Sequence, residues 1–184
     1  TGYIGSHTCV ELLNSGYEVV IYDNLSNSNV QVLERIKAIT GKQPAFIQGD
    51  IRDEELMTRS MVGCSAVIHF AGLKAVGESS QIPIEYYDNN INGTLCLLRA
   101  MKKNSIYNLV FSSSATVYGD PLYLPLDENH PLSATNPYGR TKLFIEQILR
   151  DVYTSDKNWH IALLRYFNPI GAHSSGLIGE SPNG

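Results

Sequence analysis

The stretch that decides the fold is Ser112-Ser113-Ser114-Ala115-Thr116-Val117-Tyr118-Gly119, together with Asn136-Pro137-Tyr138-Gly139-Arg140-Thr141-Lys142. The first piece comes directly after Leu109-Val110-Phe111, an apolar run short enough to be one buried strand. The second piece predicts the start of a helix, because Asn136 is a suitable N-cap and proline is favoured at the first helical position. We therefore expect a strand and a helix joined by one polar loop.

The spacing of Tyr138 and Lys142 indicates proton transfer. Residues four apart lie on one face of a helix, about one turn from each other. An ordinary tyrosine has a pKa of about 10, and a nearby cation lowers it. With the Ser114 hydroxyl at the end of the preceding strand, the set contains a base, a cation and a hydrogen-bonding partner, the minimum for removing a proton from an alcohol. The spacing alone is also common on exposed helices, so the serine-rich strand end carries part of the argument.

The N-terminal segment predicts a glycine-rich turn that opens into a helix. Gly2 and Gly5 precede a helical pattern over 6–15, and Gly16 is placed to stop it. In a dinucleotide-binding fold such glycines admit a pyrophosphate close to the backbone. Gly-x-x-Gly is equally typical of an ordinary turn, so this assignment depends on the strand that comes next in the chain.

Asp23 ends that strand-like apolar run, 18 residues after Gly5. At this spacing a carboxylate accepts hydrogen bonds from an adenosine ribose and repels a 2'-phosphate. The alternative is an aspartate that caps a turn before Asn24. No arginine directly follows Asp23, which favours NAD over NADP.

The remaining pattern alternates strands and helices. Strands are expected over 17–23, 45–50, 66–72, 108–113 and 160–167, and helices over 26–40, 53–61, 83–103 and from 137. This order predicts an α/β fold, a Rossmann-like doubly wound parallel sheet. Ligands of such sheets bind beyond the carboxyl ends of the strands, where Asp23, Gly72, Ser114 and Phe167-Asn168 fall. We expect His69, inside an apolar strand, to be a core histidine.

Composition narrows the class of protein. The 184 residues are 43% hydrophobic and 17% charged, enough to bury one core. A net charge of -4 argues against nucleic acid as the main partner. No apolar run approaches the roughly 20 residues that span a bilayer, and we expect no membrane partner. Cys9, Cys64 and Cys96 lack metal-ligand spacing, so we expect no metal and three reduced core thiols of a cytoplasmic protein.

Several segments resemble one known family over essentially the whole chain. HFAGLKAVGES, YYDNN, FSSSATVYGD, NPYG, LLRYFNP and GAH are similar to the extended short-chain dehydrogenase/reductases that epimerise nucleotide sugars. The resemblance implies Ser114, Tyr138 and Lys142 as catalytic residues. It implies an NAD site at Gly2, Tyr3, Ile4, Gly5, Asp23, Asn24, Asp50, Ile51, Phe70, Ala71, Gly72, Lys74, Asn89, Ser112, Tyr138, Lys142 and Phe167. It implies substrate contacts from Lys74, Ser114, Ala115, Thr116, Tyr138, Tyr166 and Asn168.

Two assignments stay open beside the resemblance. Asp50 either contacts the adenine, as in the family, or caps the helix expected over 53–61. Asn90 and Asn92 lie in a helical pattern, where buried amides usually belong to a polar network, so we expect structural roles for them.

The resemblance implies interconversion of UDP-glucose and UDP-galactose, with NAD as the bound cofactor. Tyr138 would take the 4-hydroxyl proton while hydride passes from C4 to NAD, and the 4-keto sugar would turn over and be reduced on its other face. A 4,6-dehydratase is disfavoured, because that family carries Asp-Glu where this chain has Ala115-Thr116. A non-catalytic NAD-binding protein and a plain dehydrogenase also compete with this interpretation. The intact Ser114, Tyr138 and Lys142 argue against a non-catalytic protein. A plain dehydrogenase would be recognised by exchange of its cofactor.

We also expect the chain to be a fragment cut at both ends. Thr1-Gly2-Tyr3-Ile4-Gly5 begins inside a motif, and Glu180-Ser181-Pro182-Asn183-Gly184 stops in a turn-like stretch. Residues 1–184 would then be a partial NAD-binding domain, without the first strand of the sheet and without most of the nucleotide-sugar domain. For the full-length protein the resemblance implies a homodimer.

Overall fold

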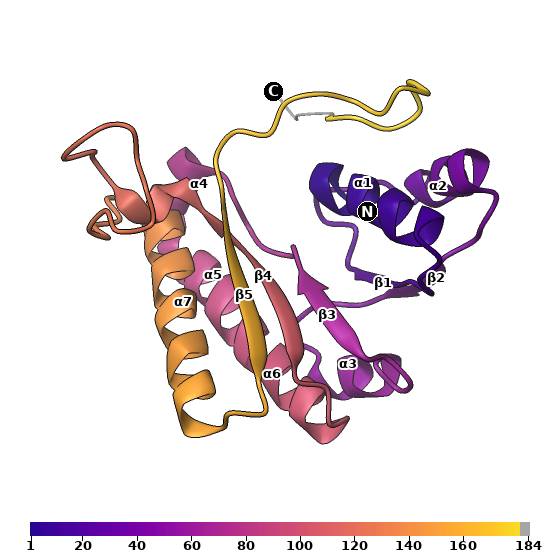
Figure 1. Cartoon of the computed structure of the whole chain (residues 1–184), viewed down its shortest axis with the longest axis horizontal. Helices are drawn as coiled ribbons and strands as arrows, with labels where there is room; N and C mark the ends of the chain where they lie inside the picture. The colour runs from indigo at the N-terminus through magenta and orange to yellow at the C-terminus, as the bar shows by residue number, and fades with distance from the viewer. Residues whose placement is uncertain (181–184) are drawn as a thin grey trace. The chain divides into compact units, whose positions relative to one another are not determined.

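The computed structural model describes residues 1–180 (Figure 1). In chain order its elements are α1 (Tyr3–Asn14), β1 (Val20–Asp23), α2 (Val32–Thr40), β2 (Ala45–Gln48), α3 (Glu54–Ser60), β3 (Ala66–His69), α4 (Val76–Gln81), α5 (Pro83–Tyr87), the π-helical turn η1 (Asp88–Asn92), α6 (Gly93–Lys103), β4 (Asn108–Ser114), the 3-10 turn η2 (Ala115–Tyr118), α7 (Pro137–Ser155) and β5 (His160–Tyr166).

These elements form two compact units, each with its own parallel sheet. Unit 1 consists of Thr1–Asp50 with the segment from Pro169, and contains the sheet β1-β2. Unit 2 consists of Ile51–Asn168 and contains the sheet β3-β4-β5. All strand pairs within these sheets are parallel, so the predicted α/β, Rossmann-like alternation of strands and helices is confirmed. That a first strand outside the chain completes one sheet stays a prediction.

The sheet of unit 2 contains the serine-rich stretch Ser112 to Ser114 at the end of β4. β4 is the middle strand, and its last three residues, Ser112 to Ser114, pair in register with Leu164 to Tyr166 of β5. Because neighbouring side chains of a strand alternate between faces, Ser113 points toward one side of the sheet and its two neighbours toward the other. Ser113 is buried, whereas Ser112 and Ser114 are partly exposed.

Helix α7 begins where the sequence predicts. The Oδ1 atom of Asn136 accepts a hydrogen bond from the Gly139 backbone N–H at 2.8 Å, and Pro137 is the first helical residue. The helix runs for 19 residues and buries a stripe that includes Lys142, Ile145 and Glu146. This stripe packs against β4 and β5.

Several predicted boundaries need correction. The helix expected over 83–103 is interrupted by η1, and α4 precedes it unpredicted. Helix α2 starts at Val32 instead of residue 26, because the side chains of Asn24 and Asn29 accept hydrogen bonds from backbone N–H groups two residues on and hold turns. Helix α1 starts earlier than predicted, at Tyr3, and the predicted strands over 17–23, 45–50, 66–72 and 160–167 are shorter.

Each unit has its own apolar core. In unit 1, α1, α2 and β1 meet at Val10, Leu13, Ile21, Leu33 and Ile36. In unit 2, the helix-facing side of β4 buries Leu109 and Phe111. The three cysteines are free, as predicted. Cys96 is buried, and Cys9, although partly exposed, packs against the core of unit 1, so the assignment to the core needs correction only for the partly exposed Cys64.

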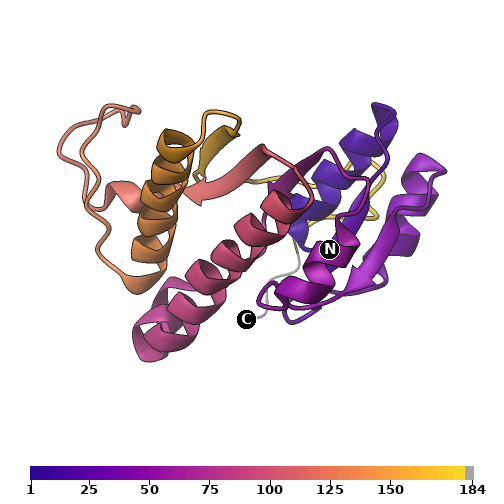
Figure 2. The ribbon, with the colours of Figure 1, turned by 90° about the horizontal axis from the view of Figure 1, so that it is seen from below.

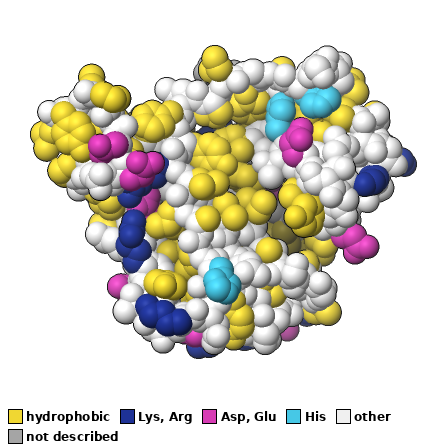
Figure 3. Space-filling model, viewed as in Figure 1, with side chains coloured by type: hydrophobic (Ala, Val, Ile, Leu, Met, Phe, Trp, Pro, Cys, Tyr) yellow, Lys and Arg dark blue, Asp and Glu magenta, His cyan; other side chains and the backbone are white. Residues whose placement is uncertain are grey.

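The helices of unit 2 that pack against its sheet lie on one face of that sheet. Figures 1 and 2 show α5, α6 and α7 on the same side of β4 and β5. The opposite face carries hydrophobic side chains, which Figure 3 shows gathered over β4 and β5. A shallow hollow of about 390 Å³ there is lined by residues that include Ile68, Val110 and Ala162, and Leu164 is 43% exposed. Apolar patches of this kind promote association.

We expect purified residues 1–184 to self-associate and to bind a hydrophobic dye, because the face of the unit 2 sheet opposite these helices is apolar. Leu164→Glu, which puts a charge on that face, should reduce both effects in light scattering and dye fluorescence. Val62→Glu, at a 76%-exposed valine outside the sheet, is the control and should leave them unchanged. A monomeric chain without dye binding would contradict the expectation.

Candidate active site

The predicted catalytic residues lie together in unit 2, on facing parts of α7 and β4. Tyr138 and Lys142 occupy successive turns at the start of α7, and Ser114 is the last residue of β4. The Lys142 Nζ atom lies 6.0 Å from the centre of the Tyr138 ring. The Ser114 side chain lies close enough to the Tyr138 phenol to lower its pKa. The structure therefore brings together a phenol, a hydroxyl and an ammonium, as the spacing predicts.

Lys142 is a buried cation whose position is fixed by the strand. Its Nζ donates to the Ser112 carbonyl oxygen at 2.8 Å and lies over the Phe111 ring, 4.9 Å from the ring centre. The residue is only 5% exposed. Burial lowers the pKa of Lys142 to about 8, since the charged form is poorly solvated.

Burial also acts on Tyr138, and there it makes the group a weaker acid. Burial raises the pKa of the Tyr138 phenol, and the nearby Ser114 side chain lowers it by less, so the pKa stands above its ordinary value. The four-residue spacing predicts that Lys142 lowers the pKa of Tyr138. In the structure the pKa of Tyr138 is raised instead. The reason is that burial disfavours the phenolate more than the surrounding groups favour it.

The turn after Ser114 is held close to the start of α7. Ser114 caps η2, and its Oγ accepts hydrogen bonds from the backbone N–H and the hydroxyl of Thr116 at 3.2 and 3.0 Å. A Cβ atom at Gly139 would lie 3.0 Å from the Thr116 carbonyl oxygen, so glycine permits this close approach. Ala115 and Thr116, predicted to contact substrate, are both partly exposed.

A polar network organises the loop after β3. Asn90, in η1 and 2% exposed, accepts a hydrogen bond from the Leu73 N–H and donates to the Leu73 carbonyl and the Thr141 hydroxyl. This fixes the turn at Gly72, where a Cβ atom would lie 3.2 Å from Asn90 Oδ1. Asn89 donates to the same Oδ1 atom at 2.9 Å. The predicted structural role of Asn90 is confirmed.

The other predicted residues of unit 2 lie at strand ends or on nearby loops. The rings of Phe70 and Tyr166, at the carboxyl ends of β3 and β5, lie 6.4 Å apart. Phe167 is 60% exposed, and Ala71, Lys74 and Asn168 are exposed as well. Ile51 is buried, and its side chain occupies the space left by the missing side chain of Gly93. Asn92 bonds to Asp88 on the surface of η1.

The predicted residues of unit 1 lie at the start of α1, at the end of β1 and directly after β1 and β2. Gly2 is the N-cap of α1, without a side-chain cap, and a Cβ atom there would meet nothing within 4 Å. Tyr3, Ile4 and Gly5 form the first turn of α1, not the preceding loop.

Asp23 holds a turn, which is one of its two predicted roles, and its predicted role as an acceptor for an adenosine ribose stays a prediction. Its Oδ1 accepts from the Leu25 N–H at 2.8 Å, and its Oδ2 accepts from the Thr1 amino group at 2.7 Å. Asn24 donates to the Asp50 carboxylate at 3.2 Å. The cap of α3 is Asp53, whose Oδ1 accepts from the Leu56 N–H.

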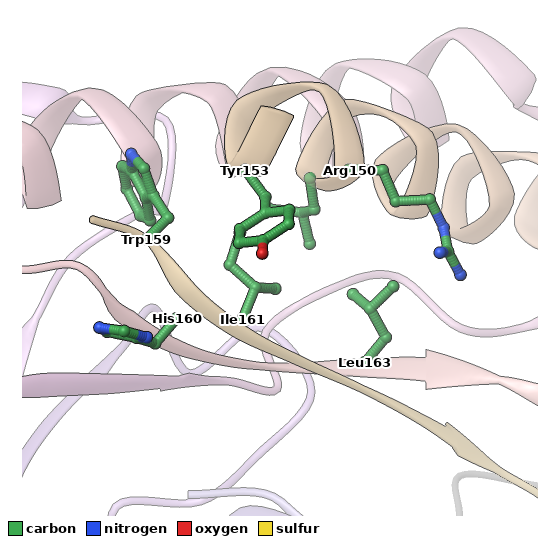
Figure 4. A pocket seen from close by; sticks show the side chains of 7 residues that line it. Arg150, Tyr153, Trp159, His160, Ile161 and Leu163 are labelled. Carbon is green, nitrogen blue, oxygen red and sulfur yellow. The ribbon is translucent and has the colours of Figure 1, made fainter. Parts of the chain in front are cut away.

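Two hollows of the surface lie away from the catalytic residues. Figure 4 shows one of about 450 Å³ between the end of α7 and β5, lined by Leu149, Arg150, Tyr153, Trp159, His160, Ile161 and Leu163. It contains none of the predicted site residues. Among residues 1–180, no cluster of three or more His, Cys, Asp or Glu side chains could hold a metal ion. In the same part of the chain, no helix has the length and apolarity to cross a membrane.

Comparison with known proteins places these observations in a family. Residues 1–180 match the model of the NAD dependent epimerase/dehydratase family. The chain belongs to this family. It is 61% identical to UDP-glucose 4-epimerase of Bacillus subtilis (strain 168) and 57% identical to that of Dictyostelium discoideum, covering 100% and 98% of this chain and 55% and 53% of those proteins. The chain thus spans about half the length of these relatives.

Solved structures of epimerases agree with the fold. The UDP-glucose-4-epimerase of Stenotrophomonas maltophila, with bound NAD and formylated UDP-arabinopyranose, has a TM-score of 0.97 at 54% identity, over 100% of this chain and 55% of that one. The enzyme of Bifidobacterium longum, in complex with NAD+ and UDP, has a TM-score of 0.96 at 57% identity, over 100% of this chain and 56% of that one. The resemblance read from the sequence is confirmed.

Two groups near the site went unpredicted. Thr141, fully buried between Tyr138 and Asn90, joins α7 to η1. Glu146 and Arg165 form an ion pair with an N–O distance of 2.7 Å, beneath the serine-rich stretch. A signal was present in the sequence, since a charged residue in the apolar run Ile161-Ala162-Leu163-Leu164-Arg165 requires a partner when buried.

His69 generates a prediction about pH. It is 5% exposed, its Nε2 lies 3.0 Å from the Thr94 hydroxyl, and burial with the nearby Lys142 charge lowers its pKa to about 3. The unfolded chain binds the proton near pH 6.5 and the folded chain does not, so His69 lowers stability as pH falls from 6.5 toward 3. The slope should approach about 1.4 kcal/mol per pH unit.

We expect His69→Gln to flatten the dependence of unfolding free energy on pH between 6.5 and 5, in urea titrations of the full-length protein. Carboxylates remain charged in that range and contribute little to the difference. The control His160→Gln, at an exposed histidine, should keep the parental slope. Equal slopes for parent and His69→Gln would show that His69 is not the group responsible.

Proposed function

We propose that the full-length protein containing this chain interconverts UDP-glucose and UDP-galactose with NAD as its bound cofactor. One observation carries the proposal: Tyr138, Ser114 and Lys142 are assembled at the end of β4 and the start of α7 in a member of the NAD dependent epimerase/dehydratase family. The relatives of similar sequence are UDP-glucose 4-epimerases.

The residues present fit a dinucleotide. The uncapped N-terminus of α1, with open space at Gly2, suits an anionic pyrophosphate, because its N–H groups have no side-chain partner. The carboxylate of Asp23 suits a ribose hydroxyl. The turn at Gly72 lies beside Lys142, since a Cβ atom at Gly72 would be 3.9 Å from Lys142 Nζ. Without a side chain at this position, a flat ring or a ribose can approach the backbone closely. NAD, when bound, would accept hydride from the sugar and return it.

Tyr138 would act as the general base and later the general acid. Its phenol can take the proton of a sugar 4-hydroxyl and give it back, while the Ser114 hydroxyl orders the hydrogen bonds around the transfer. Burial raises the pKa of Tyr138, so a cation must favour the phenolate during turnover. Lys142, held by the Ser112 carbonyl, is placed to do this and to bind a ribose.

We assign the substrate to the exposed strand ends and loops around this centre. The proposed substrate contacts are Lys74, Ala115, Thr116, Tyr166 and Asn168. We also propose that residues 1–184 are part of an NAD-binding domain, and that the longer protein contains a nucleotide-sugar domain as well. The proposed compartment is the cytoplasm, where thiols remain reduced.

The full-length protein is proposed to be a homodimer. A surface of α5 and α7 supports this: Ile84 is 77% exposed, Phe144 is 40% exposed, and the Phe144 ring stacks on Tyr87 with 6.4 Å between ring centres. Aromatic and aliphatic side chains of this kind are typical of subunit interfaces. Sedimentation equilibrium of the full-length protein tests this.

Tyr138→Phe in the full-length protein should lower kcat for UDP-galactose by about 10²–10⁴-fold, the usual effect of losing general acid–base catalysis. Bound NAD should persist, because the ring remains. Tyr107→Phe is the matched control, since Tyr107 packs on Trp159 in the same unit, and it should keep parental activity. Activity of Tyr138→Phe within a few-fold of the parent would exclude Tyr138 as the base.

Asp23→Ala should weaken NAD binding and relax the discrimination against NADP, because a ribose acceptor and a repelling charge are both lost. Asp23→Asn separates the two roles: it keeps an oxygen for the Leu25 N–H but removes the charge, and should still relax the discrimination. The measurement is the ratio of dissociation constants for NAD and NADP. An unchanged ratio in both variants would leave Asp23 as a turn residue only.

A further inference from the structure

Glu146 is a buried carboxylate with no part in the proposed proton transfer. It lies on α7, has no exposed surface, and is four residues beyond Lys142 and eight beyond Tyr138. Residues at this spacing lie on one face of a helix, so Glu146 continues the stripe of the two catalytic side chains. It therefore faces the same strand as they do.

The carboxylate binds the middle serine of the serine-rich stretch. Glu146 Oε1 accepts a hydrogen bond from the Ser113 hydroxyl at 2.5 Å. Lys142 meanwhile donates a hydrogen bond to the Ser112 carbonyl, and the Ser114 side chain lies close enough to the Tyr138 phenol to lower its pKa. Three successive turns of α7 thus contact three successive residues of β4.

Arg165 adds the neighbouring strand to this contact. It lies beside Ser113 in the β4–β5 register and gives two hydrogen bonds to Glu146, from Nε at 3.0 Å and Nη2 at 2.7 Å. Its Nη1 donates to the Tyr118 hydroxyl at 3.0 Å, with the guanidinium 4.8 Å from the centre of the Tyr118 ring. Burial raises the pKa of Glu146, but the bonds from Arg165 and Ser113 outweigh it and hold the pKa below its usual value.

These bonds anchor both ends of one short segment. Ser113 precedes Ser114, and Tyr118 is the last residue of η2, so Ser114, Ala115 and Thr116 lie between two anchored positions. We propose that the Glu146–Arg165 pair is a positioning device, which sets where Ser114 stands relative to Tyr138 by holding Ser113 to Glu146 of α7 and Tyr118 to Arg165 of β5. The kinetic part of this inference rests on the proposed function. A buried ion pair is weak evidence for stability and is retained for geometry in some proteins.

The test is Arg165→Met in the full-length holoenzyme. It removes the bonds to Glu146 and Tyr118 and touches neither Tyr138 nor Ser114. We expect kcat for UDP-galactose to fall about tenfold or more, with KM and bound NAD little changed, since small misplacements of reacting groups are costly. We also expect the pKa of Tyr138, read from the ¹³C shift of labelled tyrosine and assigned with Tyr138→Phe, to rise, because the nearby Ser114 side chain lowers it.

The matched control is Arg99→Met, which removes the ion pair of Arg99 with Glu54 elsewhere in unit 2. It should change neither kcat nor the Tyr138 titration. Ser113→Ala removes a single hydrogen bond and should move both readouts in the same direction by a smaller factor, which keeps the test valid if Arg165→Met does not fold.

A lower melting temperature with unchanged kcat and an unchanged Tyr138 titration would overturn the proposal and leave the pair a purely structural contact. The titration reads the position of Ser114 without any substrate. If the parent did not epimerise UDP-galactose, the proposed function would fail, and a rise of the Tyr138 pKa in Arg165→Met would still support the positioning role.

Discussion

The fit of α7 against the end of β4 is the constraint on which unit 2 depends. Tyr138, Lys142 and Glu146 recur every four residues, and they meet Ser114, Ser112 and Ser113 of the strand. The strand offers a carbonyl and two hydroxyls within three residues, so a shift of the helix by one turn would leave buried polar groups without partners. Packing and chemistry are thereby linked, because the contacts that hold α7 against β4 also position the Tyr138 phenol.

Burial at this contact works against the charges that catalysis needs. It raises the pKa of Tyr138 and lowers that of Lys142 to about 8, so phenolate and ammonium are both disfavoured by their surroundings. Lys142 retains its proton below that pH, and its Nζ lies 6.0 Å from the centre of the Tyr138 ring. In a site of low dielectric constant, an added positive charge acts strongly on the phenol. Without such a charge the Tyr138 phenol stays protonated, and its ionisation depends on the positive charges close to it.

The sequence predicted the elements that depend on local rules. Asn136-Pro137 located the start of α7 because capping and proline geometry are local, and the alternation of strands and helices located the parallel sheets. It also grouped Ser114, Tyr138 and Lys142, whose spacing carries the chemistry. The Glu146–Arg165 pair was not predicted, because it joins residues 19 apart on different elements and only the tertiary packing brings them together. The predicted lowering of the Tyr138 pKa was wrong for the same reason, because the spacing of residues in the sequence does not show how deeply a side chain is buried.

The break in the helix predicted over 83–103 has a physical cause that also concerns the site. The π-helical turn η1 contains Asn90, whose amide oxygen and nitrogen bond to Leu73 on the loop after β3 and to Thr141 on α7. A regular helix would satisfy its own backbone but would rotate this side chain away from one of these partners. Such single-turn bulges are frequent at functional sites. Local propensity is overridden here because one side chain must hold the glycine turn and the helix of Tyr138 in a fixed relation.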